Sequence, residues 1–198
     1  GPRFPPGNPG RRPPLTGRMV DVASYRLATH LGLAFAILGL TFWYILDLRR
    51  SETDLLQARR QGERRLFAVA TGLLHLSFLQ ILLGALVAGI DAGRAFPTWP
   101  LMGDSFFPAD AFYVPGGGAV WRAFFENPGL VQFVHRVTGY LVLALAAVAY
   151  VKARQSAHPL TTGAFLLVLV GVMAQVALGV VTVLNGAPLA LGLAHQLG

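Results

Sequence analysis

The sequence contains no cysteine and few charged residues. Without cysteine, the chain has no disulfide bonds, iron–sulfur clusters or thiolate metal sites. Charged residues make up 13% of its 198 positions, whereas soluble domains carry about 25%. The opening stretch GPRFPPGNPGRRPP also lacks the apolar region expected of a secretory signal peptide. These absences argue against a soluble domain, a disulfide-rich secreted scaffold and a thiolate metal protein.

Long apolar runs take the place of the missing charges. Hydrophobic residues make up 54% of the sequence, and a helix needs about 20 mainly apolar residues to cross a bilayer. The runs predict helices over about 24–46, 66–90, 130–151 and 160–184, and a fifth run begins at 189. We therefore predict an all-α protein, a polytopic transmembrane helical bundle.

The segments between the runs predict the orientation of the bundle. Residues 1–22 are rich in Pro, Gly and Arg and are expected to be disordered or loop-like. The loops at 47–65 and 152–159 contain six and two basic residues, whereas the long loop at 91–129, which is rich in Gly, Pro and aromatics, contains two. By the positive-inside rule, the first two loops are cytoplasmic and 91–129 is external.

The net charge of +7 has an explanation that does not involve nucleic acid. Its arginines gather in the loops that flank the apolar runs, as topology signals do in membrane proteins. No other feature of the sequence is typical of a protein that reads bases. We expect the lipid bilayer, and no nucleic acid, as the partner of this charge pattern.

Three histidines occupy equivalent places in the apolar runs. His30, His135 and His195 each lie a few residues inside the start of a run, on the first, third and fifth runs. Alternate membrane-spanning helices point the same way, so the three imidazoles are expected at one depth, near the outer face. Ionisable side chains inside a membrane are costly and usually mark a site. Several imidazoles at one level, with no cysteine, favour a haem held between helices.

Residues one helical turn from these histidines fit the same cofactor. Arg26, one turn before His30, can pair with a haem propionate. Gly139, one turn after His135, is expected to let a porphyrin ring approach the backbone beside that ligand. Two glycines flank His195 in a similar way: Gly192 and Gly198.

Two glutamines begin similar short sequences in the second and fourth runs. Gln80 starts QILLG and Gln175 starts QVALG. Each sequence lies at a similar depth and is followed, after an external loop, by a helix that bears one of the histidines. We expect the amides to join helices, and the repeat suggests duplicated helical units. Close packing is the role expected of four glycines in these runs, Gly84, Gly89, Gly171 and Gly179.

The other polar residues of interest have simpler interpretations. His75, near mid-membrane, is expected to form a hydrogen bond with a neighbouring helix. His158 lies in a charged loop and is expected to be solvated. Asp91 and Arg94 begin the long external loop. They are expected either to bind haem propionates or to form an ion pair with each other at the surface, and the surface ion pair is favoured.

Four motifs resemble the haem A synthase family over residues 20–198. They are YRLATHLGLA at 25–34, GALVAGIDAGRAFPTWPLMG at 84–103, FVHRVTGY at 133–140 and AHQ at 194–196. The resemblance implies an eight-helix fold of two pseudo-symmetric halves, of which this chain covers the fourth helix to the start of the eighth. Residues 23–46 would be the last helix of the N-terminal half, and 66–198 the C-terminal half, incomplete in its last helix.

The resemblance also implies a role for each site residue. His135 and His195 match the pair that axially ligates a haem b. Arg26 and Arg136 are expected to bind the cofactor as well. His30 matches a catalytic histidine of the N-terminal half, where haem O binds and reacts. All three histidines are therefore expected to be metal ligands.

The implied reaction is the oxidation of the C8 methyl group of haem O to a formyl group, which gives haem A for terminal oxidases. Such an oxidoreductase lies in the bacterial inner membrane, or in the mitochondrial inner membrane of a eukaryote. The implied partners are haem O, delivered by haem O synthase, and an electron acceptor that the sequence does not identify; a homo-oligomer is compatible with the sequence.

The sequence departs from the family pattern in two ways. The family's other N-terminal histidine and a nearby glutamate lie on a helix that this chain does not contain, so the 198 residues alone are expected to be inactive. The external cysteine pair of some members is also absent.

Two other functions are compatible with an apolar bundle of this kind. The first is a di-haem b electron-transfer subunit, which places ligands near both membrane faces, whereas these three histidines share one face. The second is a transporter or structural membrane protein without a cofactor, which leaves the common depth of the histidines unexplained.

Overall fold

The computed structural model describes residues 24–60, 62–114 and 117–197 as helices joined by loops. Residues 1–22, predicted to be disordered or loop-like, lie outside the described residues. Within the described part, extended pairing is limited to one isolated bridge between Met102 and Ser105. The prediction of an all-α bundle is confirmed.

Four helices are long and apolar enough to cross a membrane. They are α1 (Ser24–Leu48), α3 (Arg64–Gly89), α5 (Pro128–Ala153) and α6 (Pro159–Leu184). Each boundary lies within two residues of the sequence prediction. A shorter helix, α7 (Leu189–Leu197), corresponds to the fifth apolar run.

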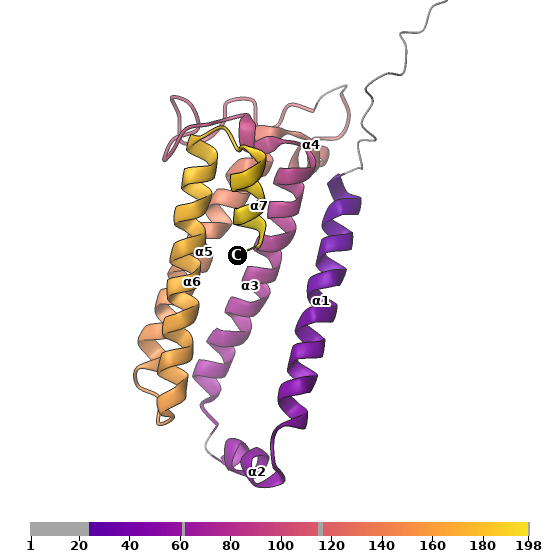
Figure 1. The fold of residues 1–198 in the computed structure, drawn as a ribbon. Coiled ribbons are helices and arrows are strands. Elements are labelled where there is room, and N and C mark those ends of the chain that lie inside the picture. Colours follow the sequence, from indigo (N-terminus) through magenta and orange to yellow (C-terminus); the bar gives the residue numbers. More distant parts are fainter. Residues whose placement is uncertain (1–23, 61, 115–116, 198) are drawn as a thin grey trace, which may run out of the picture.

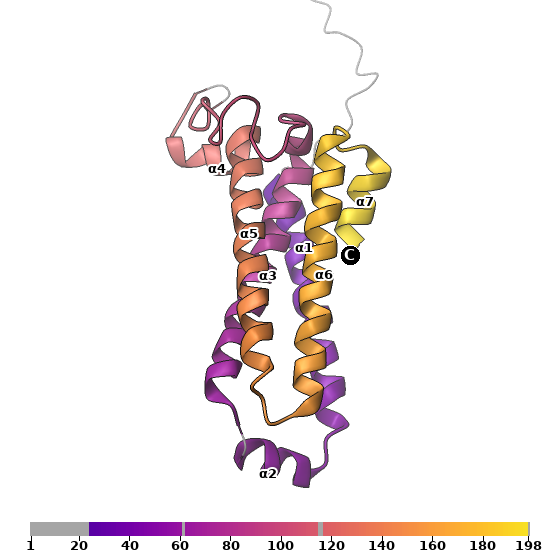
Figure 2. The same cartoon turned by 90° about the vertical axis from the view of Figure 1, so that its left-hand side faces the viewer.

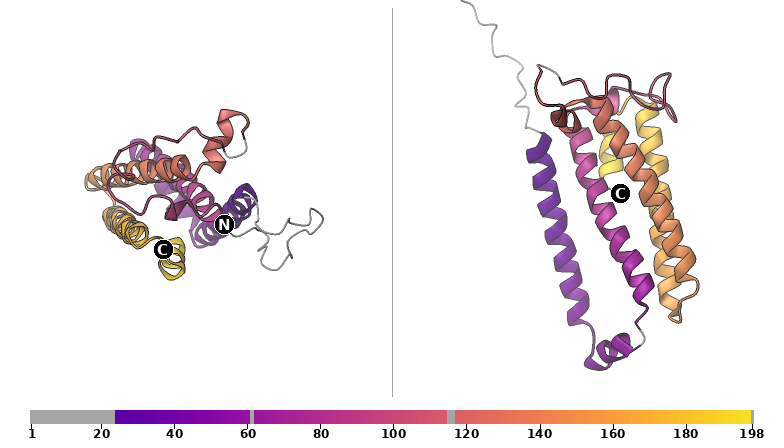
Figure 3. Two further views of the ribbon diagram at one scale, coloured as in Figure 1. Left: turned by 90° about the horizontal axis from the view of Figure 1, so that it is seen from above. Right: turned by 180° about the vertical axis from the view of Figure 1, so that it is seen from behind.

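The helices form an up-and-down bundle in which chain neighbours pack together. Helix α3 packs against α1 and α5, and α6 packs against α5 and α7. Helices α1, α5 and α7 start at the same end of the bundle, where the long connection between α3 and α5 lies (Figures 1 and 2). Seen from above, α1 stands at one side of the bundle against α3 (Figure 3). This topology places the N-terminal turns of the three histidine-bearing helices together at one end.

Large apolar side chains cover the outside of the bundle. Leu160 and Leu167 of α6 are 89% and 74% exposed, and Trp43 of α1 is 67% exposed. A soluble protein rarely exposes continuous apolar surface of this kind, whereas lipid tails solvate it at no cost. The four spans and their exposed apolar faces identify an integral membrane protein.

The charged segment at 47–65 was predicted to be a loop, but part of it is helical. It contains a short helix, α2 (Glu52–Arg60), below the bundle (Figure 1). The helix begins with a capping box: Asp54 N donates to Ser51 Oγ at 3.2 Å, and Ser51 N donates to Asp54 Oδ2 at 3.0 Å. The Ser51 hydroxyl also donates to Asp54 Oδ2 at 2.6 Å, and this bond, together with the one from Ser51 N, lowers the pKa of the Asp54 carboxyl group. Local capping chemistry thus forms a helix where the polar composition indicated none.

Two apolar clusters fill the bundle above and below the middle of α5. The upper cluster joins α1, α3 and α5, and the lower joins α3, α5 and α6. Alanines make up three of the five buried members of the upper cluster and two of the four of the lower, which lets the helices approach closely, as is usual between membrane helices. Their buried members are Ala28, Ala85, Leu86, Ala92 and Val131 in the upper cluster, and Leu73, Val142, Ala146 and Ala149 in the lower.

The predicted external loop is partly helical. The connection from residue 90 to residue 127 contains η1 (Ala92–Arg94), η2 (Val120–Arg122) and α4 (Ala123–Glu126). A third apolar cluster, which includes Ala111, Ala123 and Leu130, fixes this connection on the first turns of α5. The connection therefore lies at the end of the bundle at which the three histidine-bearing helices begin, and it packs on α3, α5 and α6 there.

Buried Asn127 joins the connection to α5. Its Oδ1 accepts from Leu130 N at 2.8 Å and so caps the helix, and Pro128 occupies the first helical position. Its Nδ2 donates to the carbonyl oxygens of Asp110 and Tyr113 at 2.7 and 3.0 Å. One side chain thus satisfies a helix terminus and two loop carbonyls.

We expect Asn127→Ala to destabilise the protein by about 2 kcal/mol, because the cap is lost and two carbonyls lose their donor. Denaturation of the protein in mixed detergent micelles measures this change. Asn185→Ala is the matched control: that amide is exposed and donates only to Val181 O, one turn earlier. Equal stability of the two variants would contradict the role given to Asn127.

Candidate functional site

Two of the three predicted histidines face each other inside the bundle. His135 of α5 and His195 of α7 have ring centroids 6.3 Å apart, and their ring planes are inclined by 83°. They lie seven and six residues after the first residue of their helices, which start at the same end of the bundle. The parallel direction of the two helices and the similar offsets bring together side chains that are far apart in the sequence.

Each of these rings has a buried nitrogen that lacks a hydrogen bond. Nδ1 of His135 and Nδ1 of His195 have no partner among the described residues. An unsatisfied buried polar atom costs about 1–3 kcal/mol, so native structures rarely retain one without a reason. Two of them on facing rings are a feature of a site that a ligand completes.

A glycine of the preceding helix borders each imidazole. A Cβ atom at Gly84 of α3 would lie 3.3 Å from His135 Cε1, and one at Gly179 of α6 would lie 2.9 Å from His195 Cε1. Only glycine leaves enough room for these rings. The prediction of close packing is borne out at both positions, whereas Gly171 has nothing within 4 Å and the prediction is wrong there.

The distance between the rings suits two ligands on opposite sides of one metal ion. A metal–imidazole bond is about 2 Å long, and the ring centre lies roughly 1 Å further on, so the two centres would be about 6 Å apart. Among the described residues, no group of three His, Cys, Asp or Glu side chains could hold a bare ion. Two imidazoles alone suit a metal that brings its other ligands, as the iron of haem does. The donor set and the spacing therefore fit a haem.

Gln80 of α3 lies against the same histidine. Its Nε2 donates to the backbone carbonyl of His135 at 3.1 Å and is 3.4 Å from His135 Nε2. The expected bond between helices is confirmed for Gln80. Half-buried Gln175, by contrast, makes no hydrogen bond with a described residue.

Gly139 has a different neighbour from the one expected. A Cβ atom there would lie 3.1 Å from Gln80 Nε2, so the glycine admits the Gln80 amide to the backbone of α5. The sequence predicted a porphyrin beside Gly139, whereas in the structure the Gln80 amide of α3 lies there. Gly192 has open space around it, and Gly198 lies outside the described residues.

The third predicted ligand does not join the pair. His30 and Arg26 are exposed on α1, and neither side chain forms a hydrogen bond or ion pair with a described residue. Helix α1 packs mainly on α3, at the edge of the bundle. The roles predicted for these two residues stay predictions.

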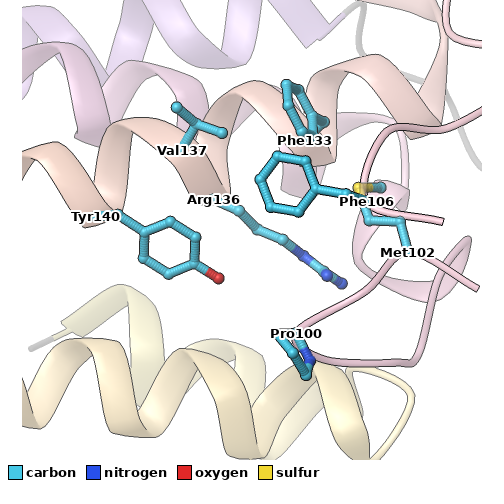
Figure 4. A pocket seen from close by; sticks show the side chains of 7 residues that line it. All are labelled: Pro100, Met102, Phe106, Phe133, Arg136, Val137 and Tyr140. Atoms are coloured by element: carbon cyan, nitrogen blue, oxygen red, sulfur yellow. The ribbon is translucent and has the colours of Figure 1, made fainter.

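Arg136 holds the external connection against α5. Its guanidinium group donates to the carbonyl oxygens of Phe96 and Leu101 at 2.9 and 3.3 Å. Gln132, one turn earlier, donates to the same Phe96 carbonyl at 3.3 Å. Arg136 also lines a small pocket under the connection (Figure 4), together with Pro100, Met102, Phe106, Phe133, Val137 and Tyr140. The described contacts of Arg136 are thus with the loop, and its predicted contact with a cofactor remains a prediction.

Two anchors of the connection were not found from the sequence. They are Gln132 and the pair formed by Trp99 and Tyr140, in which Trp99 Nε1 donates to Tyr140 Oη at 2.8 Å. The Tyr140 partner lies 41 residues further along the chain, and no local pattern marks such a contact. Asn127, in contrast, could have been found, because Asn before Pro is typical of a helix start.

The remaining polar residues differ in part from their predicted roles. His75 Nδ1 bonds the carbonyl of Thr71 on its own helix at 2.7 Å, so the predicted bond to a neighbouring helix is wrong. His158 is half-buried at the start of α6, where its backbone N–H donates to Ser156 Oγ at 3.1 Å. Asp91 and Arg94 form no ion pair with each other; the backbone N–H of Arg94 instead donates to Asp91 O at 3.1 Å, which closes a turn.

Comparison with known proteins places this bundle among its relatives. The family model of the cytochrome oxidase assembly protein, COX15-CtaA, matches residues 14–198. A haem A synthase of Paracoccus denitrificans (strain Pd 1222) is 60% identical over 184 residues, which cover 93% of this chain and 48% of the relative. The haem A synthase of Roseobacter denitrificans is 56% identical over 178 residues, covering 90% and 46%.

A third relative agrees with these two. The haem A synthase of Cereibacter sphaeroides (strain ATCC 17029) is 55% identical over 190 residues, covering 93% of this chain and 49% of the relative. The chain thus spans about half the length of the curated relatives it matches. No solved structure matches it significantly. Because the family model covers almost the whole chain, the chain belongs to the COX15-CtaA family of cytochrome oxidase assembly proteins.

Proposed function

We propose that this chain is part of a haem A synthase, in which His135 and His195 are the axial ligands of a haem b. The observation that carries the proposal is the pair of facing imidazoles, 6.3 Å apart, each with an unsatisfied buried nitrogen. The names of the relatives support the same reading, because the three described above are haem A synthases. The activity is proposed for the full-length protein, because this chain spans only about half the length of these relatives.

The proposed reaction oxidises the C8 methyl group of haem O to the formyl group of haem A. Haem O is the substrate, and His30 on α1 is the residue of this chain proposed to hold it at the reacting site, with Arg26 one turn away for a propionate. A bound haem b supplies one-electron redox chemistry to such an enzyme. The electron acceptor is a partner that the chain's residues do not identify.

The surroundings of the histidine pair have a clear part in this function. His135 lies between two apolar clusters, and the external connection covers the end of the bundle nearest to it, held by Arg136, Gln132 and Asn127. Apolar surroundings limit the access of water to the two imidazoles. The bundle and its cover therefore orient the two ligands and keep the site dry.

The orientation of the protein follows from its loops. We propose that the segments 47–65 and 152–159, which contain half of the basic residues, face the cytoplasm. The histidine pair then lies near the outer face of the inner membrane, under the external connection. Haem O is hydrophobic and can reach such a site from within the membrane, after its release by the synthase that makes it.

The full-length protein, purified in detergent, tests the proposed function. We expect a b-type band in its reduced-minus-oxidised spectrum, and haem O or haem A among the haems extracted from it. Absence of a b-type band would refute the haem site. Haem b as the sole extracted haem would instead favour a di-haem b electron-transfer subunit.

A further inference from the structure

The repeated glutamine–glycine spacing of α3 and α6 coincides with the two candidate ligands. Gln80 and Gly84 lie on α3, and Gln175 and Gly179 lie on α6. Residues four apart share one face of a helix, so each glutamine lies one turn from its glycine on a common face. In both cases that face meets the histidine of a following helix.

On α3, the two residues contact different parts of His135. Gln80 reaches the backbone, since its Nε2 donates to the His135 carbonyl at 3.1 Å. Gly84 borders the ring, with its Cβ position 3.3 Å from Cε1. Gly139 completes the arrangement, because any larger residue there would meet the Gln80 amide. The backbone and the ring of one ligand are thus both constrained from a single face of α3.

The Gln80 amide is held in this place although its hydrogen bonding is incomplete. Its Oε1 is buried and has no partner among the described residues, while its Nε2 faces both the carbonyl and the ring of His135. An unmade buried hydrogen bond costs about 1–3 kcal/mol, so an amide that is not otherwise constrained would also satisfy its oxygen. We therefore infer that the Gln80 side chain is held in place by its contacts with His135.

On α6, the same face borders the second ligand more tightly. A Cβ atom at Gly179 would lie 2.9 Å from Cε1 and 3.2 Å from Nε2 of His195. Half-buried Gln175 lies one turn earlier on that face, where Gln80 lies relative to Gly84. The glycines of QILLG and QVALG therefore border the two imidazoles alike, whereas among the described residues only Gln80, and not Gln175, bonds the ligand beside its glycine.

We propose that Gln80 and Gly84 of α3 and Gly179 of α6 are positioning residues, which fix the orientation of the His135 and His195 imidazoles. Together they set the steep angle of 83° between the two ring planes. The inference rests on the proposed function, since it assumes that these histidines bind one haem b. It adds three residues that touch no iron but act through the ligands, as outer-shell groups do at other metal sites.

Electron paramagnetic resonance of the oxidised, full-length protein tests this inference. The angle between two axial imidazole planes determines the anisotropy of low-spin ferric haem, and steeply inclined planes give a single, strongly shifted low-field feature. We expect this feature in the wild type. Gln80→Met keeps the length of the side chain and removes the donor, so we expect a smaller low-field shift and a changed midpoint potential.

A second variant keeps Gln80 but displaces its side chain from His135. In Gly139→Ala, the new methyl group displaces the Gln80 amide from His135, so we expect a spectral change in the same direction. His75→Leu is the matched control on α3: it also replaces a polar side chain, but His75 bonds only its own helix, so its spectrum should equal that of the wild type.

The outcomes separate this inference from the proposed function. If the wild type contains haem b and both variants retain its resonance spectrum and potential, the positioning role is refuted while the haem site stands. If either variant loses haem b but unfolds at the same temperature as His75→Leu, the positioning role is supported. A wild type without haem b overturns both proposals.

Discussion

Replacing His135 or His195 with alanine is expected to abolish the b-type spectrum of the full-length protein. The two rings face each other at 6.3 Å, and a six-coordinate iron that loses one of two axial imidazoles loses half of its protein ligands. His30→Ala is expected to leave the b-type spectrum intact and to stop the formation of haem A, because His30 lies on α1, at the edge of the bundle.

Difference spectra and haem extraction measure these effects in detergent-purified protein. His75→Ala and His158→Ala serve as controls, since neither residue contacts the facing pair, and both should retain the wild-type haem content. An intact b-type spectrum in both His135→Ala and His195→Ala would disprove the pairing. Loss of that spectrum in His30→Ala would show that the pair is not a separate site.

Gly179→Ala is expected to weaken haem b binding more than Gly84→Ala does. The added methyl group at Gly179 would be 2.9 Å from the His195 ring, closer than any real Cβ contact, whereas at Gly84 it would be 3.3 Å from the His135 ring. Overpacking of a closed site costs about 1–3 kcal/mol, which corresponds to about 5- to 150-fold in affinity. We place Gly179→Ala near the upper end of that range and Gly84→Ala near the lower.

Gly171→Ala provides the matched control on the helix that carries Gly179. No atom lies within 4 Å of its Cβ position, and alanine favours a helix by about 1 kcal/mol over glycine. Haem retention during detergent dilution compares the three variants, and thermal unfolding compares their stability. Equal haem retention in all three would contradict the contact between glycine and imidazole.

The membrane helices could be predicted to within two residues because their signal is local. About 20 successive apolar residues are sufficient to define a span, and the charged or proline-rich segments between spans define its ends. The shared depth of His135 and His195 was also predictable, because alternate spans run in the same direction. His30 is exposed on α1, and its role as a ligand stays a prediction.

The lateral arrangement of the bundle could not be predicted in this way. His75 was assigned a partner on another helix, but Thr71 on its own helix offers a carbonyl one turn away. Gly139 was assigned to a porphyrin, but Gln80 from α3 fills the place. Both errors concern which face of a helix meets which neighbour, and apolar residues on all sides of a membrane helix leave that choice open.

Most contacts of the external connection could not be predicted from the sequence either, but one could. Its aromatic residues indicated a functional loop, yet its anchors on Gln132 and Arg136 depend on contacts 36 and 40 residues apart. The helix start at Asn127 is the exception, because capping is encoded by adjacent residues. Glutamine–glycine repeats such as QILLG and QVALG were visible in the sequence, but only the fold showed that each meets a histidine.

The separation of the two facing histidines along the chain has a consequence for biogenesis. His195 follows His135 by 60 residues, so at about 5–20 residues per second the ribosome makes the second ligand roughly 3–12 s after the first. During that interval α5 waits in the membrane with one half of the pair, and the Gln80 amide on the earlier helix α3 is already available to it. The proposed haem site can therefore be complete only after α7 has been made, so the proposal implies that haem is captured late in the synthesis of this bundle.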